Sequence, residues 1–550
     1  MKKLIFTLAA FAAGLALFAA EPIMRVGLLT DTHIKAKKSS CERLAGAYAL
    51  FRKQNVDMII NTGDIADVYD VRAYRNYRDT VNKAYEGVEK RPAEIFVYAN
   101  HDRIRREKES CWDVFKDVKK ELGIPNDPYD IIKFKGYTFV VIPQFVNWEK
   151  YAQMLETAAK ENPDKPFFVL DHIPPKPNDP KSPRHKLLKK YPNAVVFCGH
   201  AHATLRNERL IWQDGFTAVR LGSMYDWRLS LVGSVPQSFN SDMFAVLEVY
   251  KDKLVIRRYS ALKQQEYRAN DPWTIPLPFD PATAPYTFEK RAAESTAPEF
   301  PAGAGIKLAP NANGVQITFP KSTHPDGVLK YVVELFCENN GSWQRLSRQD
   351  VNGDFMFDEQ ERKAEIMHTI SAGFFDVGKK YRVTVSPVHV FGKQGRCISA
   401  EFSAPEFAKH TIIYECKEPM KELLFKSGLA GGEVFKLDKD GFYIHNNYNG
   451  RLEFPGEVWA GKAGTRFRFI IDMHLKQGKF DPWSVVLRNP KPLKNASHRI
   501  ATECGDSGAQ RFVIEFTKRK SAFKYYLLIR EGETGKIRFN YVRIERLDNK

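Results

Sequence analysis

The chain of 550 residues is poor in cysteine and has only one long apolar run, and both shortages exclude classes of protein. Its seven cysteines lie far apart with no CxxC pair, which excludes a disulfide-dependent scaffold and a cysteine zinc site. After residue 20, no segment reaches the roughly 18 uninterrupted apolar residues that span a bilayer. Internal repeats and heptads are also missing, so the chain is expected to be a monomer.

The one long apolar run stands at the start of the chain. A Met-Lys-Lys start precedes an apolar stretch over residues 4–18, and two alanines stand before Glu21. This pattern is typical of a secretory signal peptide over residues 1–20, and an uncleaved membrane anchor is the alternative. We therefore expect an exported protein, periplasmic or secreted, whose mature chain has no integral membrane segment.

Positive charge is in excess, and half of the excess lies in the last quarter of the chain. The formal net charge is +18, and residues 411–550 contribute +9 of it through 26 basic and 17 acidic residues. A basic module favours anionic partners such as phosphate esters, acidic glycans or nucleic acid. The alternative is an ordinary solvated basic surface.

Apolar runs alternate with amphipathic segments over about residues 24–223, which predicts an α/β sheet covered by helices on both faces. The expected strands are 24–30, 56–60, 94–98, 137–143, 166–170, 194–198 and 216–221, and the expected helices include 42–54, 71–90 and 149–162. An antiparallel hairpin is predicted at 243–250 and 254–259. Seven prolines between 272 and 301 then predict an extended linker without a long helix.

The rest of the chain shows short alternating strands and almost no helical pattern, which predicts two all-β sandwich modules. We therefore expect a signal peptide over 1–20, an α/β domain with its proline-rich tail over 21–300, and sandwiches over 301–408 and 409–550.

Five of the predicted α/β strands end in polar side chains that bind metals. In chain order these are Asp31 and His33; Asp64 and Asp67; Asn100, His101 and Asp102; Asp171 and His172; His200 and His202. Strand ends of an open α/β sheet share one edge, so these groups are expected to converge there. Mixed oxygen and nitrogen ligands without cysteine suit manganese, iron or zinc. Two such metals about 3.5–4 Å apart hold the attacking and leaving oxygens of a phosphoryl transfer.

These blocks, in this order, resemble the calcineurin-like metallophosphoesterase family, whose motifs are D-x-H, G-D-x-x-D, G-N-H-D or -E, an isolated His and G-H-x-H. The resemblance covers about residues 24–260 and departs at Ala99, where the family usually has glycine. It implies layered β-sheets flanked by helices. It also implies a dinuclear-metal enzyme that hydrolyses phosphate mono- or diesters by in-line attack of a metal-bridging hydroxide.

The resemblance also implies a role for each residue of the blocks. The first metal is assigned to Asp31, His33, Asp64 and His202, and the second to Asp64, Asn100, His172 and His200, with Asp64 as the bridge. His101 is expected to face the substrate and protonate the leaving oxygen or stabilise the transition state, while Asp102 orients its ring. Asp67 is expected in a turn or behind the ligands. The motif lacks the tyrosine that binds ferric iron in the related purple acid phosphatases, which argues against their coloured iron site.

The sequence says less about the residues that bind substrate than about the metal ligands. Arg103, beside the predicted dyad, is the candidate for holding a phosphate oxygen. The basic residues of segment 181–190 either bind an anion or form a solvated helix face, and segment 221–227 either lines the cleft or packs in the core. The motifs are common to monoesterases and diesterases, so they do not choose between these reactions.

The two predicted sandwiches carry looser resemblances. Residues 301–408 look similar to a fibronectin type III module, through the strand 381–385, the turn 392–395 and a last strand near 397–402. The final module resembles the jelly-roll domains of carbohydrate-binding proteins through its closing strand 537–544. The aromatic residues Tyr443, Tyr448, Trp459 and Trp483 either stack on sugar rings or fill the sandwich core.

The sequence is compatible with three functions. The favoured one is an exported phosphoesterase whose last module docks it to a glycan or an anionic surface. The second is a nuclease or nucleotide phosphodiesterase that the basic tail delivers to its substrate, and the third is a binding protein that kept the scaffold without turnover.

Overall fold

The computed structural model describes the chain in the ranges 21–37, 41–102, 111–175, 181–228, 238–353, 363–407, 410–419, 424–427, 439–440, 443–445, 450–454, 458, 460–477, 480–488, 498–500, 508–518, 526–531 and 535–547. The predicted signal peptide lies outside these ranges. The chain forms two compact units. The first unit is Met1–Arg228 with Ser238–Glu294, and the second unit is Ser295–Lys550 with Leu229–Gln237.

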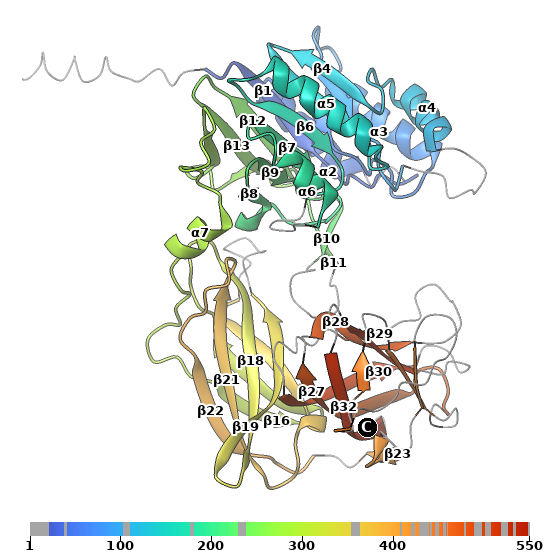
Figure 1. The fold of residues 1–550 in the computed structure, drawn as a ribbon, viewed down its shortest axis with the longest axis vertical. Helices are drawn as coiled ribbons and strands as arrows, with labels where there is room; N and C mark the ends of the chain where they lie inside the picture. The colour runs from blue at the N-terminus through green and yellow to red at the C-terminus, as the bar shows by residue number, and fades with distance from the viewer. Residues whose placement is uncertain are drawn as a thin grey trace, which may run out of the picture. The chain divides into compact units, whose positions relative to one another are not determined.

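Two β-sheets form the centre of the first unit (Figure 1). The first sheet has the order β14-β13-β12-β1-β2-β3, with β15 also beside β13. Its strands are β1 (Met24–Leu29), β2 (Met58–Asn61), β3 (Ala93–Phe96), β12 (Met243–Val249), β13 (Lys253–Ser260), β14 (Gln265–Tyr267) and β15 (Trp273–Pro276). Strands β1, β2 and β3 are parallel, and the predicted hairpin of β12 and β13 is confirmed.

The second sheet has the order β4-β5-β6-β7-β9-β8. Its strands are β4 (Asp130–Phe134), β5 (Tyr137–Ile142), β6 (Phe167–Asp171), β7 (Ala194–Cys198), β8 (Ile211–Gln213) and β9 (Thr217–Arg220). Strands β5, β6, β7 and β9 are parallel to one another, whereas β4 and β8 pair antiparallel at the two edges.

The sheets face each other across one apolar core, and helices cover their outer faces. Alternate residues of β1, such as Val26 and Leu28, meet Phe168 and Val195 of the second sheet in this core. On the outer side of the first sheet lie α2 (Glu42–Lys53), α3 (Val71–Ala84) and α4 (Cys111–Leu122), and on the outer side of the second lie α5 (Trp148–Glu161) and α6 (Pro183–Leu188). The layered β-sheets flanked by helices that the family resemblance implies are therefore confirmed, whereas the apolar pattern alone predicted only one sheet. Both faces of each strand are apolar, so the pattern does not show which strands share a sheet.

Helix α3 illustrates how local sequence sets these elements. The Asp70 side chain caps its start by accepting the backbone N–H of Arg72, and Ala73, Tyr74 and Tyr77 place an apolar stripe against the first sheet. The helix ends at Ala84, six residues before the predicted end at residue 90. After it, Gly87 adopts a φ of +72°, a left-handed conformation that ends helices.

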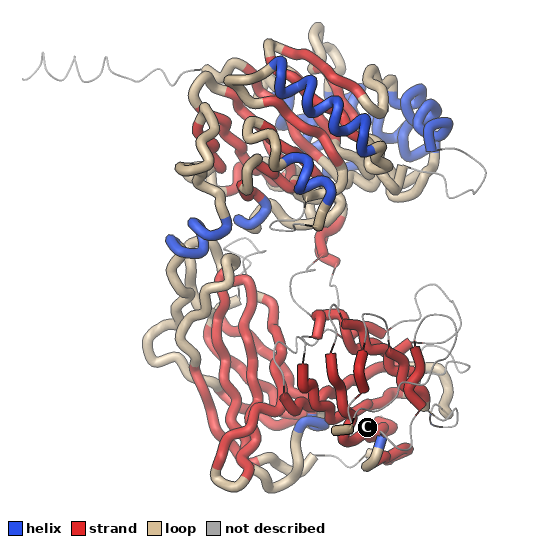
Figure 2. Tube along the Cα trace, viewed as in Figure 1, coloured by secondary structure: helices blue, strands red, loops and turns tan. Residues whose placement is uncertain are grey.

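The second unit consists of two β-sandwiches, and strands almost entirely replace the mixture of helix and strand seen in the first unit (Figure 2). In the first sandwich, a sheet of order β16-β17-β20 packs on one of order β19-β18-β21-β22. The strands are β16 (Lys307–Asn311), β17 (Gly314–Pro320), β18 (Val328–Asn339), β19 (Ser342–Asn352), β20 (Glu365–Ser371), β21 (Lys380–His389) and β22 (Ile398–Ser403). The likeness of this sandwich to fibronectin type III stays a prediction.

The last sandwich pairs a sheet of order β23-β32-β27-β30, to which β25 is added beside β32, with one of order β24-β26-β31-β28-β29. The strands are β23 (Thr411–Cys416), β24 (Leu424–Ser427), β25 (Tyr443–His445), β26 (Gly450–Glu453), β27 (Arg466–Gln477), β28 (Phe480–Arg488), β29 (His498–Ile500), β30 (Gly508–Thr517), β31 (Tyr526–Glu531) and β32 (Gly535–Leu547). The side chains of Tyr443, Tyr448, Trp459 and Trp483 lie outside the described residues, so their predicted sugar contacts stay predictions.

Two single features complete the description of the fold. Across the described ranges, no helix is both long and apolar enough to cross a membrane. Cys198 is a buried free thiol, and burial raises its pKa to about 12.

Candidate metal centre

The predicted ligands come together from the loops that follow strands of both sheets. Asp31 and His33 follow β1, and Asp64 follows β2, in the first sheet. His172 follows β6, and His200 and His202 follow β7, in the second sheet. The backbone joins the first two loops, because Asp31 N–H donates to Gly63 O at 2.9 Å and His33 N–H donates to Asp64 O at 3.0 Å. The groups thus converge as predicted, although from two sheets instead of one.

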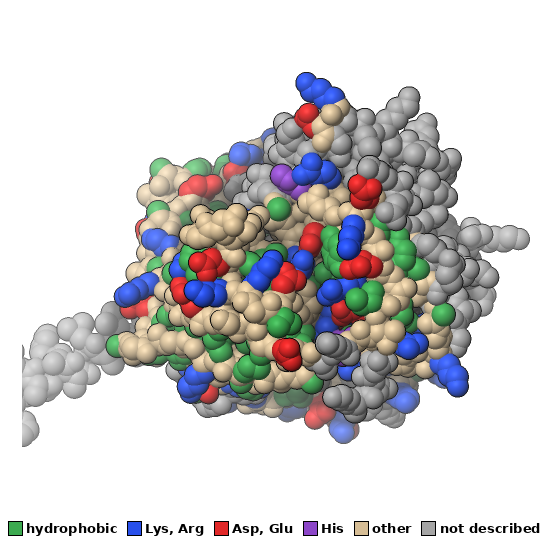
Figure 3. Space-filling view, turned by 90° about the horizontal axis from the view of Figure 1, so that it is seen from below, with side chains coloured by type: hydrophobic (Ala, Val, Ile, Leu, Met, Phe, Trp, Pro, Cys, Tyr) green, Lys and Arg blue, Asp and Glu red, His purple; other side chains and the backbone are tan. Residues whose placement is uncertain are grey.

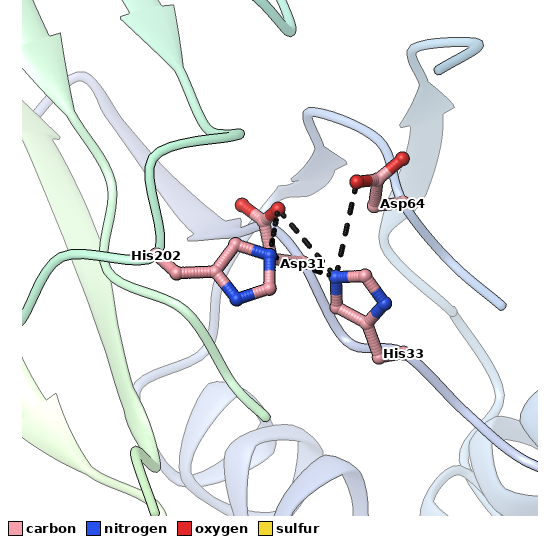
Figure 4. Close-up of side chains that lie close together, drawn as sticks. All are labelled: Asp31, His33, Asp64 and His202. Atoms are coloured by element: carbon pink, nitrogen blue, oxygen red, sulfur yellow. Dashed lines mark hydrogen bonds and ion pairs between the residues drawn. The ribbon is translucent and has the colours of Figure 1, made fainter. Parts of the chain in front are cut away.

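The first group consists of Asp31, His33, Asp64 and His202, each with one ligand atom within 4.8 Å of the others (Figure 4). The Nε2 atoms of His33 and His202 face each other at 2.9 Å. Asp31 Oδ1 lies 3.2 Å from His202 Nε2, and Asp64 Oδ2 lies 3.8 Å from His33 Nε2. This is the residue set predicted for the first metal.

The second group consists of Asp64, His172 and His200, whose ligand atoms also lie within 4.8 Å of one another. His172 Nδ1 lies 2.8 Å from the carbonyl oxygen of Thr62, which leaves Nε2 facing Asp64 Oδ2 at 3.2 Å. Asp64 belongs to both groups. Because the backbone N–H of His101 occupies Asp64 Oδ1 at 2.9 Å, the two groups share Oδ2.

The donor atoms fit divalent cations. His172 Nε2 and Asn100 Oδ1 are buried and lack a hydrogen bond of normal geometry, an arrangement that costs about 1–3 kcal/mol per group without a partner. The opposed Nε2 atoms of His33 and His202 likewise need a shared cation or proton between them. Carboxylate, amide and imidazole ligands together suit manganese, iron or zinc.

The electrostatics of the two groups favour positive charge. Burial opposes ionisation of Asp31, but contacts with His202 and His33 outweigh it and hold the pKa of this carboxyl well below its usual value. Burial lowers the pKa of His33 and of His172, yet the neighbouring carboxylates, Asp31 for His33 and Asp64 for His172, raise both to about 9. A cation bound here would meet ionised carboxylates, and it would displace protons from these two rings.

The backbone around the ligands is strained. Five of the predicted ligands have a left-handed conformation, which is uncommon for residues other than glycine. They are Asp31 (φ 48°), His33 (φ 43°), Asp64 (φ 53°), His200 (φ 68°) and His202 (φ 46°). Ala99, which stands where the family usually has glycine, does not have a positive φ.

Two glycines allow the loops to approach each other closely. A Cβ atom on Gly199 would lie 2.0 Å from Thr30 Oγ1 and 2.6 Å from Asp31 Oδ2. A Cβ atom on Gly63, whose φ is +111°, would lie 2.6 Å from the Ala99 Cβ and 2.8 Å from His172 Nδ1. Both positions therefore require glycine.

The predicted pairing of His101 with Asp102 is wrong. His101 Nδ1 lies 2.5 Å from the backbone carbonyl of Asp67. The fully buried Asp102 carboxylate instead accepts the backbone N–H groups of Ile65 and Ala66 at 3.1 and 3.2 Å and the hydroxyl of Tyr74 at 3.0 Å. Burial and the charge of Asp64 raise the pKa of Asp102 to about 7. Asp102 thus holds the loop after β2 and does not orient the His101 ring.

The hydrogen bonds that Asp102 accepts predict the effect of Asp102→Asn. All three short hydrogen bonds end on Oδ1, which asparagine keeps, so turnover of a phosphoester should stay within about tenfold of wild type. An aspartate that fixed the tautomer of a catalytic histidine would cost about 10⁴-fold on the same change. Asp102→Ala, which leaves the three donors without an acceptor, should lower the free energy of unfolding by about 2–4 kcal/mol. Denaturant unfolding and initial rates of the two variants show whether Asp102 holds the loop or orients His101. A 10⁴-fold loss of turnover in Asp102→Asn would show that Asp102 orients His101.

Asp67, Tyr225 and Lys35 lie beside the first group. Asp67 Oδ1 lies 3.5 Å from His33 Nδ1, which places Asp67 behind this ligand, as predicted. The ring centroid of Tyr225 lies 5.3 Å from that of His33, and Lys35 Nζ donates to the Tyr225 hydroxyl at 2.5 Å. Tyr225 belongs to the segment predicted as a cleft lining, whereas Lys35 was missed because a single lysine near a motif carries no pattern.

The remaining substrate-binding predictions have different outcomes. Arg103 lies outside the described residues, so its role stays a prediction. In the basic segment 181–190, Arg184 Nε donates to Asp171 Oδ2 at 2.7 Å, and His185 Nε2 lies 2.8 Å from Asp214 Oδ2. Arg184 therefore supports the strand end that carries His172, and the contact of His185 with Asp214 supports the packing of α6.

Comparison with known proteins agrees with this geometry. Residues 24–204 match the family model of the calcineurin-like phosphoesterases, and this segment includes every residue of both groups. The family is one of hydrolases of phosphoric ester bonds. A search of curated protein sequences finds no match.

Solved structures also show similarity to the chain. A dimetal phosphatase from Danio rerio is 14% identical, with 47% of this chain and 100% of the other covered and a TM-score of 0.30. The purple acid phosphatase PPD1 from yellow lupin (Lupinus luteus) is 12% identical, with 46% and 53% covered and a TM-score of 0.35. The CBM1 module of BiXyn10A is 9% identical, with 24% and 98% covered and a TM-score of 0.19.

Proposed function

We propose that the first unit hydrolyses phosphate mono- or diesters with two divalent cations. The observation that carries this proposal is that two groups of ligand atoms share Asp64 Oδ2. Within each group, the ligand atoms lie within 4.8 Å of one another. Asp31, His33, Asp64 and His202 would hold one cation, and Asp64, Asn100, His172 and His200 the other. Bound there, such a pair supplies an activated water and neutralises the charge of the phosphate oxygens.

His101 is the proposed proton carrier for the leaving oxygen. Its Nδ1 is fixed on the Asp67 carbonyl, which leaves Nε2 to give or hold a proton. Its ring meets the ring of His33 edge to face with centroids 4.6 Å apart, so it lies directly beside the first group. A half-buried position lets the ring reach a substrate while the loop keeps its orientation.

Lys35 and Tyr225 are proposed to position the phosphate. The Lys35 side chain is 43% exposed, lies 3.9 Å from Asp67 Oδ2 and lies over the Tyr225 ring. A flexible ammonium at this distance from the ligands can contact a nonbridging phosphate oxygen, and the phenol hydroxyl can donate to the same group.

We further propose that the protein is exported and that its last sandwich docks it to a glycan or an anionic surface. The export proposal rests on the pattern of residues 1–20, and a mature chain that begins at Glu21 by mass spectrometry would support it.

The docking proposal rests on the charge of +9 over residues 411–550 and on the sandwich fold. On the face drawn in Figure 3, acidic and basic side chains are interspersed among the residues shown in colour. Salt-resistant retention on immobilised neutral glycans would favour a glycan, and retention that salt abolishes would favour an anionic polymer.

The phosphoesterase proposal is tested with two chromogenic substrates. Full-length protein is incubated with manganese and either bis(p-nitrophenyl) phosphate or p-nitrophenyl phosphate, and the initial rates are compared with those after chelation. We expect turnover that chelation abolishes, and the ratio of the two rates assigns the diester or monoester class. Absence of turnover in protein shown to hold two metals would contradict hydrolysis of simple esters, and absence of both metal and turnover would favour the binding-protein alternative.

A further inference from the structure

A second concentration of metal-binding side chains lies in the first sandwich of the second unit. His324 and Asp326 lie in the turn before β18, and His389 is the last residue of β21. One ligand atom of each residue lies within 4.8 Å of the other two. The rings of His324 and His389 have centroids 3.9 Å apart, and His389 Nε2 lies 3.4 Å from Asp326 Oδ2.

His389 supplies an independent sign that a ligand belongs here. Its side chain is 0% exposed, and its Nε2 atom makes no hydrogen bond of normal geometry, although it faces Asp326 Oδ2 at 3.4 Å. The other ring nitrogen, Nδ1, lies 2.6 Å from Ser295 Oγ and 3.3 Å from the backbone N–H of Phe391, so the ring is oriented with Nε2 toward the cluster. A buried ring nitrogen that makes no hydrogen bond is unfavourable, and a cation bound between it and the Asp326 carboxylate would offset that cost.

We propose that His324, Asp326 and His389 bind a divalent transition metal, with zinc as the best fit. Two imidazoles and one carboxylate are ligands that zinc accepts, and a water completes four-coordination. Zinc-bound histidines generally donate their other N–H to a neighbouring oxygen, and Ser295 Oγ is in place for His389, whose Nδ1 would then give up the 3.3 Å hydrogen bond from the Phe391 N–H. Both nitrogens of His324 have partners, Thr296 Oγ1 at 3.2 Å and the Asp326 N–H at 3.0 Å, so metal binding exchanges one of these hydrogen bonds.

The surroundings give this site a structural role. Ser295 and Thr296, which contact the two histidines, begin the segment that enters the sandwich. Three residues later, Glu299 and Thr323 form a β-bridge with N–H to O distances of 3.1 and 2.8 Å. Zinc bound to His324, Asp326 and His389 would therefore fix the entry segment against the turn before β18. This inference does not depend on the proposed phosphoesterase activity.

The test counts zinc in the full-length protein. Wild type, Asp326→Asn and His324→Gln are dialysed against micromolar zinc and then buffer, and zinc per chain is measured by inductively coupled plasma mass spectrometry. Glu406→Gln is the matched control, because it removes one exposed negative charge from the same unit. We expect both variants to hold one zinc fewer per chain than wild type and control, with unchanged phosphoester turnover. Equal zinc content in all four proteins would overturn the proposal.

A second measurement needs no variant. Crystals of the wild-type protein soaked in zinc should show an anomalous scattering peak within reach of His389 Nε2 and Asp326. A peak there supports the site even if a variant folds poorly. Peaks at the first-unit ligands without one at His389 would overturn it.

Discussion

Asp64→Asn is expected to lower phosphoester turnover about a thousandfold and to reduce metal content below two per chain. Asp64 Oδ2 is the oxygen that both ligand groups share, so the amide removes the one negative charge common to the two sites. The fold should persist, since an asparagine oxygen can still accept the backbone N–H of His101. Initial rates with bis(p-nitrophenyl) phosphate and metal analysis on the same preparation measure both effects.

Asp252→Asn is the matched control for this variant. Asp252 is exposed in the turn between β12 and β13, so its substitution makes the same change in charge within the same unit. Control turnover should equal that of wild type. Full metal content and near-normal rates in Asp64→Asn would contradict a shared bridging carboxylate.

Gly199→Ala should reduce turnover at least a hundredfold, although it adds only one methyl group. The new Cβ would lie 2.0 Å from Thr30 Oγ1 and 2.6 Å from Asp31 Oδ2, and it must displace one of them. Asp31 Oδ2 also accepts the Thr30 hydroxyl and the His200 N–H, both at 2.9 Å, so its displacement moves ligands of both groups. Misplacement of reacting groups by about 1 Å costs about 10²-fold in rate.

The control for this variant is Gly305→Ala, where the added Cβ meets nothing within 4 Å and φ is not positive. It should leave rate and stability nearly unchanged. A crystal structure of Gly199→Ala, or the metal affinity of this variant, shows whether Asp31 has moved. Wild-type affinity together with wild-type turnover would mean that the loops after β1 and β7 can separate without consequence.

Most strands and helices of the first unit could be predicted from the apolar pattern of the sequence, whereas the layering of two sheets followed only from the family resemblance. The strand at Ala194–Cys198 was predicted to the residue, because it is apolar throughout and bounded by polar residues. Its membership in a different sheet from β1 depends on which strand edges pair. Edge pairing is decided by backbone hydrogen bonds, which leave no trace in residue type.

The same distinction applies to the site. The convergence of Asp64 with His33 and His172 was predictable, since each follows an apolar strand in a recognisable motif. The partner of His101 was not, because it is a backbone carbonyl, that of Asp67, and any residue at that position offers one. The adjacent Asp102 looked like the natural partner in sequence, but its carboxylate is turned toward the backbone of the neighbouring loop.

The left-handed backbone at five ligand positions has a consequence for engineering this protein. A non-glycine residue in that conformation costs about 1–3 kcal/mol, so the five together cost about 5–15 kcal/mol, as much as the net stability of a typical domain. Glycine at any of these positions would relieve part of that cost while deleting a ligand. A selection for heat resistance alone would therefore enrich inactive sequences, with changes at His33 or His200 among the first. Thermostable descendants have to be found by screening for turnover and melting temperature together.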